Sequence, residues 1–362
     1  MAEARMKKPD EVTRDYLIPA IKELNGQTQG REAGQVFHEF ASFCDKQLQS
    51  PEALEDLARM QKMRDKKESE AKEYDRASKS AKTPREKDHY RQAYKKAKRW
   101  LEIDSEEFQK MRANREDALR QSLENYLLSL QASDDHENDV LRVFSLWLEY
   151  SEQQLANKAV SKYLSQVPSR KFVILMNQLS SRLQAEKTDF QLLLSKLVVR
   201  ICTEHPYHGM HQIYAGAMPL VSKDDAARSR NTAAKDISRQ LRADKRGHRY
   251  WTLIHESNTC YHEVALLKDD NFKIGRSAKL EDYAQSRKMA QKVPMLKVPP
   301  PTMPIPIRAD CDYSTVPRIT AFKPTMTIAN GLSMPKIVTA AASDGQSYKQ
   351  LVSDLGSRPR TN

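Results

Sequence analysis

Three segments decide the fold of this chain: LRVFSLWLEY (Leu141–Tyr150), KFVILMNQLSSRL (Lys171–Leu183) and FQLLLSKLVVRI (Phe190–Ile201). In each of them apolar residues recur at spacings of three and four, the period of an amphipathic α-helix. The second segment carries Phe172, Leu175, Met176, Leu179 and Leu183. Helices with apolar arcs this wide are not stable alone in water, so they must pack against one another. The pattern predicts a mainly α-helical protein built as a stacked array.

Composition narrows the class of protein. Of 362 residues, 30% are charged and 39% hydrophobic, and only 10 are glycine, which fits helices with much exposed surface. The formal net charge of +12 permits an acidic partner such as nucleic acid without requiring one. The four cysteines are far apart and the N-terminus has no signal-peptide core, so we expect a reducing compartment and no disulfide framework. No apolar run is long enough to cross a bilayer, which predicts a soluble intracellular protein.

Signals for helix ends set the bounds of the other helices. Ser50-Pro51-Glu52 combines an N-cap serine, a first-turn proline and an early acid. Thr83-Pro84-Arg85-Glu86 is a capping box. The helix from Pro51 to Ser80 has few apolar residues, so we expect it to project from the array or to bury only a narrow stripe. The remaining predicted helices cover residues 14–24, 31–49, 84–130, 225–245 and 251–268.

The pattern changes after residue 268. Six prolines between Val293 and Pro306 exclude a helix there and predict an extended linker, to which we assign residues 269–306. Beyond it, residues 316–328 and 336–352 are rich in Val, Ile and Thr, as strands are. Ser343-Asp344-Gly345-Gln346 predicts a hairpin with a primed turn, because Asp-Gly tolerates positive φ. The chain is therefore predicted to be a helical array that ends in a small antiparallel β unit.

Three blocks of the sequence carry a family resemblance. They are the helix containing Trp147, the segment Val167–Leu179 (VPSRKFVILMNQL) and Glu204-His205-Pro206-Tyr207-His208. In order and spacing they resemble the FAT region of the phosphatidylinositol-3-kinase-related protein kinases, and within that family the ATM branch with its fungal Tel members. Glu204 stands where the family has aspartate. The resemblance implies a FAT-type helical solenoid over residues 1–268.

The β segment resembles the next part of the same family. PTMPIPI (Pro301–Ile307) is similar to the entry to the catalytic domain, and residues 320–352 to the first strands of the kinase N-lobe. The resemblance therefore implies a partial N-lobe over residues 307–352. In these kinases the first hairpin covers the phosphates of ATP, which is bound with Mg²⁺. Carried over to this sequence, that hairpin is Ile319–Thr325 (ITAFKPT). The candidate phosphate-covering turn consists of Phe322, Lys323, Pro324 and Thr325.

The end of the sequence departs from the family. After the strand that ends Gln350-Leu351-Val352, the family has a lysine that binds the ATP phosphates and then Gly-x-Asp-Asp-Leu-Arg-Gln-Asp. Here Ser353 stands at the position of that lysine, and residues 353–362 form an aberrant tail. Because phosphoryl transfer depends on cation and metal stabilisation, we expect no kinase activity and no tight binding of ATP or Mg²⁺ by this chain. No catalytic residue and no metal ligand is assigned.

For the intact parent, the resemblance implies a serine/threonine protein kinase that phosphorylates Ser or Thr followed by Gln. It implies a nuclear protein of DNA double-strand-break signalling, DNA repair and telomere maintenance, and a homodimer. Its partners would be the parent's own FAT helices and kinase domain, protein substrates and DNA-damage sensor proteins. A second hypothesis is a non-catalytic helical adaptor that is associated with nucleic acid. The genomic sequence after the codon for Val352 separates the two, because an open frame encoding the kinase motif favours the first.

A group of metal-ligating residue types allows two interpretations. Cys202, His205, His208 and His211 could form a metal site, because a spacing of three places some of them on one helical face. Pro206 interrupts that helix, however, and no second cysteine pair accompanies the group. We therefore favour imidazoles that pack at a helix terminus.

Two basic features also have a structural and a functional interpretation. Acids lie within and after the basic run Lys82–Arg99, which favours a solvated helix face over a DNA-binding site or a nuclear-import signal. Direct binding to nucleic acid is accordingly not expected. Lys336 lies in a predicted strand, and we interpret it as an ordinary strand residue rather than an ATP ligand.

Overall fold

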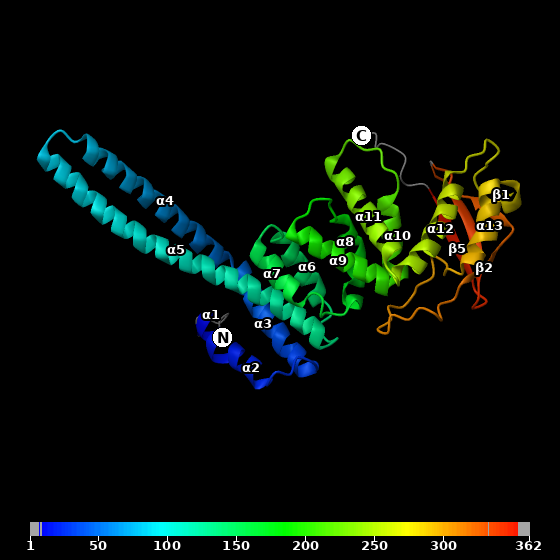
Figure 1. The fold of residues 1–362 in the computed structure, drawn as a ribbon, viewed down its shortest axis with the longest axis horizontal. Helices are drawn as coiled ribbons and strands as arrows, with labels where there is room; N and C mark the ends of the chain where they lie inside the picture. The colour runs from blue at the N-terminus through cyan, green and yellow to red at the C-terminus, as the bar shows by residue number, and fades with distance from the viewer. Residues whose placement is uncertain (1–6, 8, 332, 354–362) are drawn as a thin grey trace. The chain divides into compact units, whose positions relative to one another are not determined.

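The structure is a computed structural model that describes residues 7, 9–331 and 333–353. It divides into two compact units, residues 1–168 and residues 169–362. We describe each unit by itself, and Figure 1 labels the elements of both. Within the described residues, no helix combines the length and the apolar character that crossing a membrane requires.

Unit 1 is entirely helical in its described part. Residues 9–23 form three short successive segments, with a π-helical turn just before Pro19, where the missing proline N–H breaks the regular helix. The elements are α1 (Pro9–Val12), the π-helical turn η1 (Thr13–Leu17), α2 (Ile18–Glu23), α3 (Arg31–Gln49), α4 (Pro51–Ser80), α5 (Pro84–Ala132), α6 (Asp139–Glu149) and α7 (Gln154–Tyr163). The predicted helices at 31–49 and 51–80 are confirmed, and α7 was not predicted.

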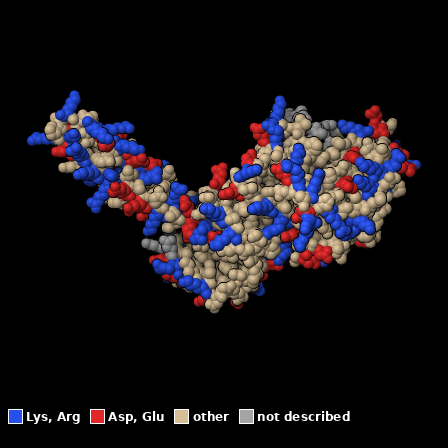
Figure 2. All heavy atoms as spheres, viewed as in Figure 1, with Lys and Arg blue, Asp and Glu red and all other residues tan. Residues whose placement is uncertain are grey.

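The longest helices of unit 1, α4 and α5, pair along their length as a hairpin (Figure 1). Both predicted starts are capped as expected. Ser50 Oγ accepts from the N–H of Ala53, and Thr83 and Glu86 form the reciprocal capping box. Among the residues of α4 only Ala71 and Ser78 are buried, so the expectation of a narrow contact stripe is confirmed. The basic run Lys82–Arg99 begins in the turn of this hairpin and continues along α5. Figure 2 shows Lys and Arg side chains interspersed with Asp and Glu on the hairpin.

Unit 2 begins with short helices and ends in a sheet. The segment Phe172–Leu183, predicted as one helix, starts as a 3₁₀-helix and becomes α-helical only at Met176. The helical elements are η2 (3₁₀, Ser169–Leu175), α8 (Met176–Ser181), α9 (Asp189–Glu204), α10 (Pro206–Ala217), α11 (Asp225–Ala243), α12 (Gly247–Leu266), η3 (3₁₀, Leu280–Asp282) and α13 (Ala284–Leu296). The strands are β1 (Ser277–Lys279), β2 (Ile319–Phe322), β3 (Thr325–Ile328), β4 (Lys336–Ala342) and β5 (Ser347–Val352).

All five strands form one antiparallel sheet with β4 inside it. β5 pairs with β4 from Lys336–Val352 to Ala341–Ser347 and so occupies one whole edge of β4. β2 lies opposite Ala340–Ala342 and β3 opposite Lys336–Ile337, so these two strands share the other edge, end to end. β1 pairs with β3 on its outer side. The predicted antiparallel β unit is confirmed, and β1 joins it from the segment that we assigned to the linker.

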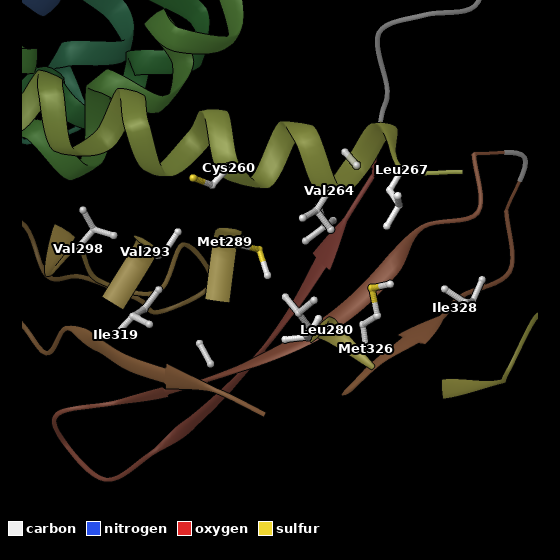
Figure 3. Packing of buried hydrophobic residues seen from close by; sticks show 14 of the residues in the cluster. Cys260, Val264, Leu267, Leu280, Met289, Val293, Val298, Ile319, Met326 and Ile328 are labelled. Carbon is white, nitrogen blue, oxygen red and sulfur yellow. The ribbon is translucent and has the colours of Figure 1, made fainter. Parts of the chain in front are cut away.

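The predicted linker, residues 269–306, is wrong for most of its length. It supplies β1 to the sheet, and residues 284–296 form α13, which includes Pro294 in its last turn. The helix ends where the proline-rich run begins, at Lys297 with φ +52. The segment also contributes five buried residues to the hydrophobic cluster shown in Figure 3, namely Phe272, Leu280, Met289, Val293 and Val298. Burial of these side chains makes residues 269–298 part of the core that joins α12 to the sheet.

Candidate functional site

The sheet of unit 2 has one covered and one open face. Along β4 the buried positions alternate, so that Lys336, Val338 and Ala340 point to one side and the residues between them to the other. The buried side belongs to the same hydrophobic cluster as Val264 of α12 and Met289 of α13 (Figure 3). The positions of β4 between the buried ones, Ile337, Thr339 and Ala341, are half-buried and face the other side, which is the candidate functional surface.

Lys336 is not an ordinary strand residue, contrary to our interpretation. Its side chain is fully buried, and Nζ donates to the carbonyl oxygens of Ala265 at 3.1 Å and Leu267 at 2.5 Å. These are carbonyls at the C-terminal end of α12, where the helix has no amide donors left to satisfy them. The amino group also lies 5.8 Å from the ring centroid of Phe272. Lys336 therefore fastens the central strand to the end of α12.

The segment ITAFKPT is not a hairpin. β2 and β3 do not pair with each other but continue along the same edge of β4, and the N–H of Lys323 donates to the carbonyl of Thr339 at 2.9 Å. Phe322 is half-buried on the covered side, with its ring in edge contact with Tyr261 of α12 at 6.3 Å between centroids. Lys323, Pro324 and Thr325 are exposed. The residues expected to form a phosphate-covering turn therefore form a kinked strand, because Pro324 interrupts the pairing without reversing the chain.

The tight turn between paired strands lies instead at Ser343–Gln346, between β4 and β5. The N–H of Gly345 donates to the carbonyl of Ala342, and the N–H of Ala342 donates to that of Gln346, both at 3.0 Å. Gly345 has φ +77, whereas Asp344 is not among the residues with positive φ. The turn is therefore of type I with glycine in the left-handed position, not the primed turn that we predicted. Asp344 supports it by accepting from the N–H of Gln346 at 2.9 Å.

One residue near the open face, Lys349, was not singled out from the sequence, whereas Ser353 was. Lys349 of β5 is exposed and lies opposite Thr339 of β4. On the other edge of β4, the carbonyl of Thr339 accepts from the N–H of Lys323. Ser353, at the position of the family's ATP-binding lysine, lies just after β5, with its hydroxyl 3.1 Å from that of Ser333. The period-two alternation of β4 and β5 would have placed Lys349 on the face opposite Lys336.

A second group of titratable side chains surrounds His205, which lies between α9 and α10. Its Nδ1 is 2.7 Å from the hydroxyl of Tyr313 and its Nε2 is 3.1 Å from that of Ser169. Burial, and secondarily His208, lowers the pKa of His205 to about 4. The ring is therefore neutral at ordinary pH. Glu204 accepts from Ser169, and the Sγ of Cys311 is 3.9 Å from Nε2 of His205.

The other three residues of the predicted group do not converge with His205. Cys202 is fully buried against Gly209 of α10. His208 Nε2 faces the carbonyl of Ile305 at 2.8 Å, and His211 Nδ1 faces Asn258 at 3.2 Å. As interpreted from the sequence, the imidazoles pack at a helix junction. The partner that sequence reasoning missed is Cys311, more than a hundred residues away, which no local spacing could reveal.

Helices followed by a small antiparallel sheet are the arrangement that the sequence resemblance implies, namely FAT-type helices and then the first strands of a phosphatidylinositol-3-kinase-related kinase. No model of a known protein family matches the chain. It is 46% identical over 352 residues to the serine/threonine-protein kinase tel1 of Emericella nidulans, covering 97% of this chain and 13% of that protein. The structure of the FAT and kinase domain of CtTel1 matches it with a TM-score of 0.85 and 43% identity, over 97% of this chain and 23% of that chain.

A complete CtTel1 dimer with C2 symmetry matches equally well, with a TM-score of 0.86 and 43% identity over 97% of this chain and 12% of that chain. The chain is thus homologous to the Tel1 kinases over a segment that takes in the end of the FAT region and the start of the kinase domain. It spans about an eighth of the length of the curated relatives that it matches.

Proposed function

We propose that this chain forms the joint that fastens the FAT helices of a Tel1-type kinase to the N-lobe of its kinase domain. The observation that carries the proposal is the buried contact of Lys336 with Ala265 and Leu267, which ties the central strand to the end of α12. α13 and β1 close the same hydrophobic cluster around that contact. A joint of this kind holds the N-lobe in a fixed orientation on the last FAT helix, because the two share one core.

The joint is tested by removing the amino group of Lys336 without changing the volume of the side chain. Lys336→Met leaves two buried carbonyls without their donor, so we expect a loss of about 1–3 kcal/mol in the free energy of unfolding, measured by urea denaturation. Lys349→Met on the open face of β5 is the matched control, and a change within about 0.5 kcal/mol is expected there. Equal effects of the two substitutions would reject the proposal.

For the intact protein we propose the activity that the resemblance implies. It would be an ATP- and Mg²⁺-dependent kinase of Ser or Thr followed by Gln, a nuclear homodimer, and a component of DNA-damage signalling, DNA repair and telomere maintenance. The identity to Emericella nidulans tel1 supports the kinase activity, and the CtTel1 dimer supports the homodimer. With Ser353 in place of the lysine, the 362-residue chain by itself would transfer no phosphate.

A chimera tests the activity and separates it from the adaptor hypothesis. Residues 9–352 of this chain replace the homologous segment of Emericella nidulans tel1, which then continues with its own lysine and catalytic residues. We expect the purified chimera to phosphorylate a Ser-Gln peptide and not the matched Ser-Ala peptide. If this chain were a free-standing adaptor with a diverged sheet, the chimera would be folded but inactive. A Ser353 version of the chimera, in which serine replaces that lysine, should lose the activity.

A further inference from the structure

Three side chains that can ligate a metal meet at the junction of α9 and α10. α9 ends at Glu204 and α10 begins at Pro206, which leaves the fully buried His205 between the two helices. The chain passes the same point again at Cys311. The possible ligand atoms of Glu204, His205 and Cys311 all lie within 4.8 Å of one another. A carboxylate, an imidazole and a thiol from two distant segments thus converge on one point.

The orientation of His205 fits a metal ligand. One ring nitrogen, Nδ1, is held by the hydroxyl of Tyr313 at 2.7 Å, and that hydroxyl also accepts from the N–H of Arg308. The other nitrogen, Nε2, faces Ser169 and Cys311. Histidine ligands bind a metal through one nitrogen while a hydrogen bond to the other fixes the ring.

The distance between Sγ of Cys311 and Nε2 of His205 is close to the distance expected for two ligands of one zinc ion. Zinc bonds of about 2.3 Å to sulfur and about 2.1 Å to nitrogen at a tetrahedral angle place the two ligand atoms about 3.6 Å apart. Sγ of Cys311 and Nε2 of His205 are 3.9 Å apart. Cys311 holds this position with φ +55, a conformation that side chains other than glycine rarely adopt. The buried Nδ1 of the neighbouring His208 meets no hydrogen-bond acceptor or donor within the described residues.

We propose that Glu204, His205 and Cys311 bind a Zn²⁺ ion that fastens the segment around Cys311 to the α9–α10 junction. Zinc suits the mixture of oxygen, nitrogen and sulfur, and its charge balances one carboxylate and one thiolate. The fourth coordination position is available to water or to the hydroxyl of Ser169. Binding releases the thiol proton of Cys311, so the affinity rises with pH. The proposal does not depend on kinase activity.

The first test measures metal bound to the full 362-residue chain. After equilibration with Zn²⁺ and removal of excess ion, we expect about one zinc per chain by mass spectrometry of the metal. With Co²⁺ as the probe, a thiolate-to-cobalt charge-transfer band should appear, and Cys311→Ser should abolish it. Tyr313→Phe, which frees Nδ1 of His205, should lower the affinity about tenfold. Asp310→Asn is the matched control, since it removes one exposed carboxylate beside Cys311 without removing a ligand, and it should keep the band.

The second test needs no variant and so does not depend on how a substituted chain folds. Cys311 is half-exposed, whereas the other three cysteines are buried. In the metal-free native chain, iodoacetamide should alkylate Cys311 selectively, and Zn²⁺ should protect it by at least about tenfold in rate, followed by peptide mapping. Absence of bound zinc, a cobalt band that survives Cys311→Ser, or alkylation that zinc leaves unchanged would each overturn the proposal. The cluster would then be only a hydrogen-bonded clamp.

Discussion

The indole N–H of Trp147 donates to Oδ1 of Asn157 at 2.8 Å within the core of unit 1. This bond joins α6 to α7, and the amide group of Asn157 in turn donates to the carbonyls of Ser151 and Gln153, which closes the turn between the helices. Trp147 is one of the residues that carried the family resemblance. Its value to the fold therefore lies in a polar contact as well as in its large apolar surface.

The contact predicts the effect of removing its acceptor. Asn157→Leu keeps the volume but takes away the acceptor of the Trp147 N–H and the donor of two turn carbonyls. We expect a loss of about 2 kcal/mol in the free energy of unfolding. Asn177→Leu in α8, at an exposed position, is the control. Urea denaturation measures both, and equal stability of the two variants would show that the bond contributes nothing.

A second prediction concerns the ion pair between α3 and α6. Both oxygens of Asp45 accept from the guanidinium of Arg142, at 2.5 and 2.6 Å, and Asp45 also accepts from the hydroxyl of Tyr126. Because Asp45 is buried, removal of Arg142 leaves an uncompensated charge, and Arg142→Leu should destabilise the protein by about 3 kcal/mol. The double variant Asp45→Leu/Arg142→Leu should lose less than the sum of the two single losses. Strict additivity in this double-mutant cycle would argue against the pair.

The histidines of α10 and α12 predict the dependence of stability on pH. Burial lowers the pKa of His211, and burial, followed by the charge of Arg242, lowers the pKa of His255. A histidine with a lower pKa in the folded state is protonated first in the unfolded state. Its stabilising contribution is therefore complete above the ordinary value of about 6.5 and is lost as the pH falls below it.

The measurement compares urea midpoints at pH 7.5 and pH 5.5 for the wild-type chain and His211→Gln. We expect the wild-type midpoint to fall on acidification and that of the variant to fall less. His248→Gln changes an exposed imidazole and should behave as the wild type. If the midpoint of His211→Gln fell as steeply as that of the wild type, His211 would not contribute to the loss of stability at low pH.

The turn of the β4–β5 hairpin gives a test of local structure. A Cβ atom added at Gly345 would meet no atom within 4 Å, so the φ of +77 is the main obstacle to substitution there. Gly345→Val should destabilise the hairpin by about 1–2 kcal/mol, whereas Gly345→Asn should lose less, because asparagine tolerates the left-handed conformation. Thermal unfolding measures which of the two variants is the more stable. The reverse order would mean that the turn is not of the observed type.

Local signals in the sequence were sufficient where the structure depends on neighbours in the chain. The helix starts at Pro51 and Pro84 follow from serine and threonine caps, whose partners lie three residues away. α7 was missed because its core side chains include the small residues Ala156 and Ala159, which give a weak periodic signal. The single helix expected over Phe172–Leu183 failed because helical period does not distinguish a 3₁₀ turn from an α-helix over so few residues.

Long-range contacts account for the larger errors. The proline-rich run correctly excluded a helix from Lys297 onward. The linker assignment from residue 269 was wrong because Met289 and Val293 pack on strands that come later in the chain. Lys336 is in phase with Val338 and Ala340, so its burial could have been suspected. The partners of its amino group could not be predicted, because the carbonyls at the end of α12 lie about seventy residues earlier in the chain.

Native-state hydrogen exchange on the 362-residue chain tests whether α12 and the sheet form one structural unit joined through Lys336. Peptides from α12 (Gly247–Leu266) and from β4 (Lys336–Ala342) should open with the same free energy, and Lys336→Met should lower both by the same amount, while Lys349→Met lowers neither. If Lys336→Met opened the sheet while α12 stayed as protected as before, α12 and the sheet would be separate units.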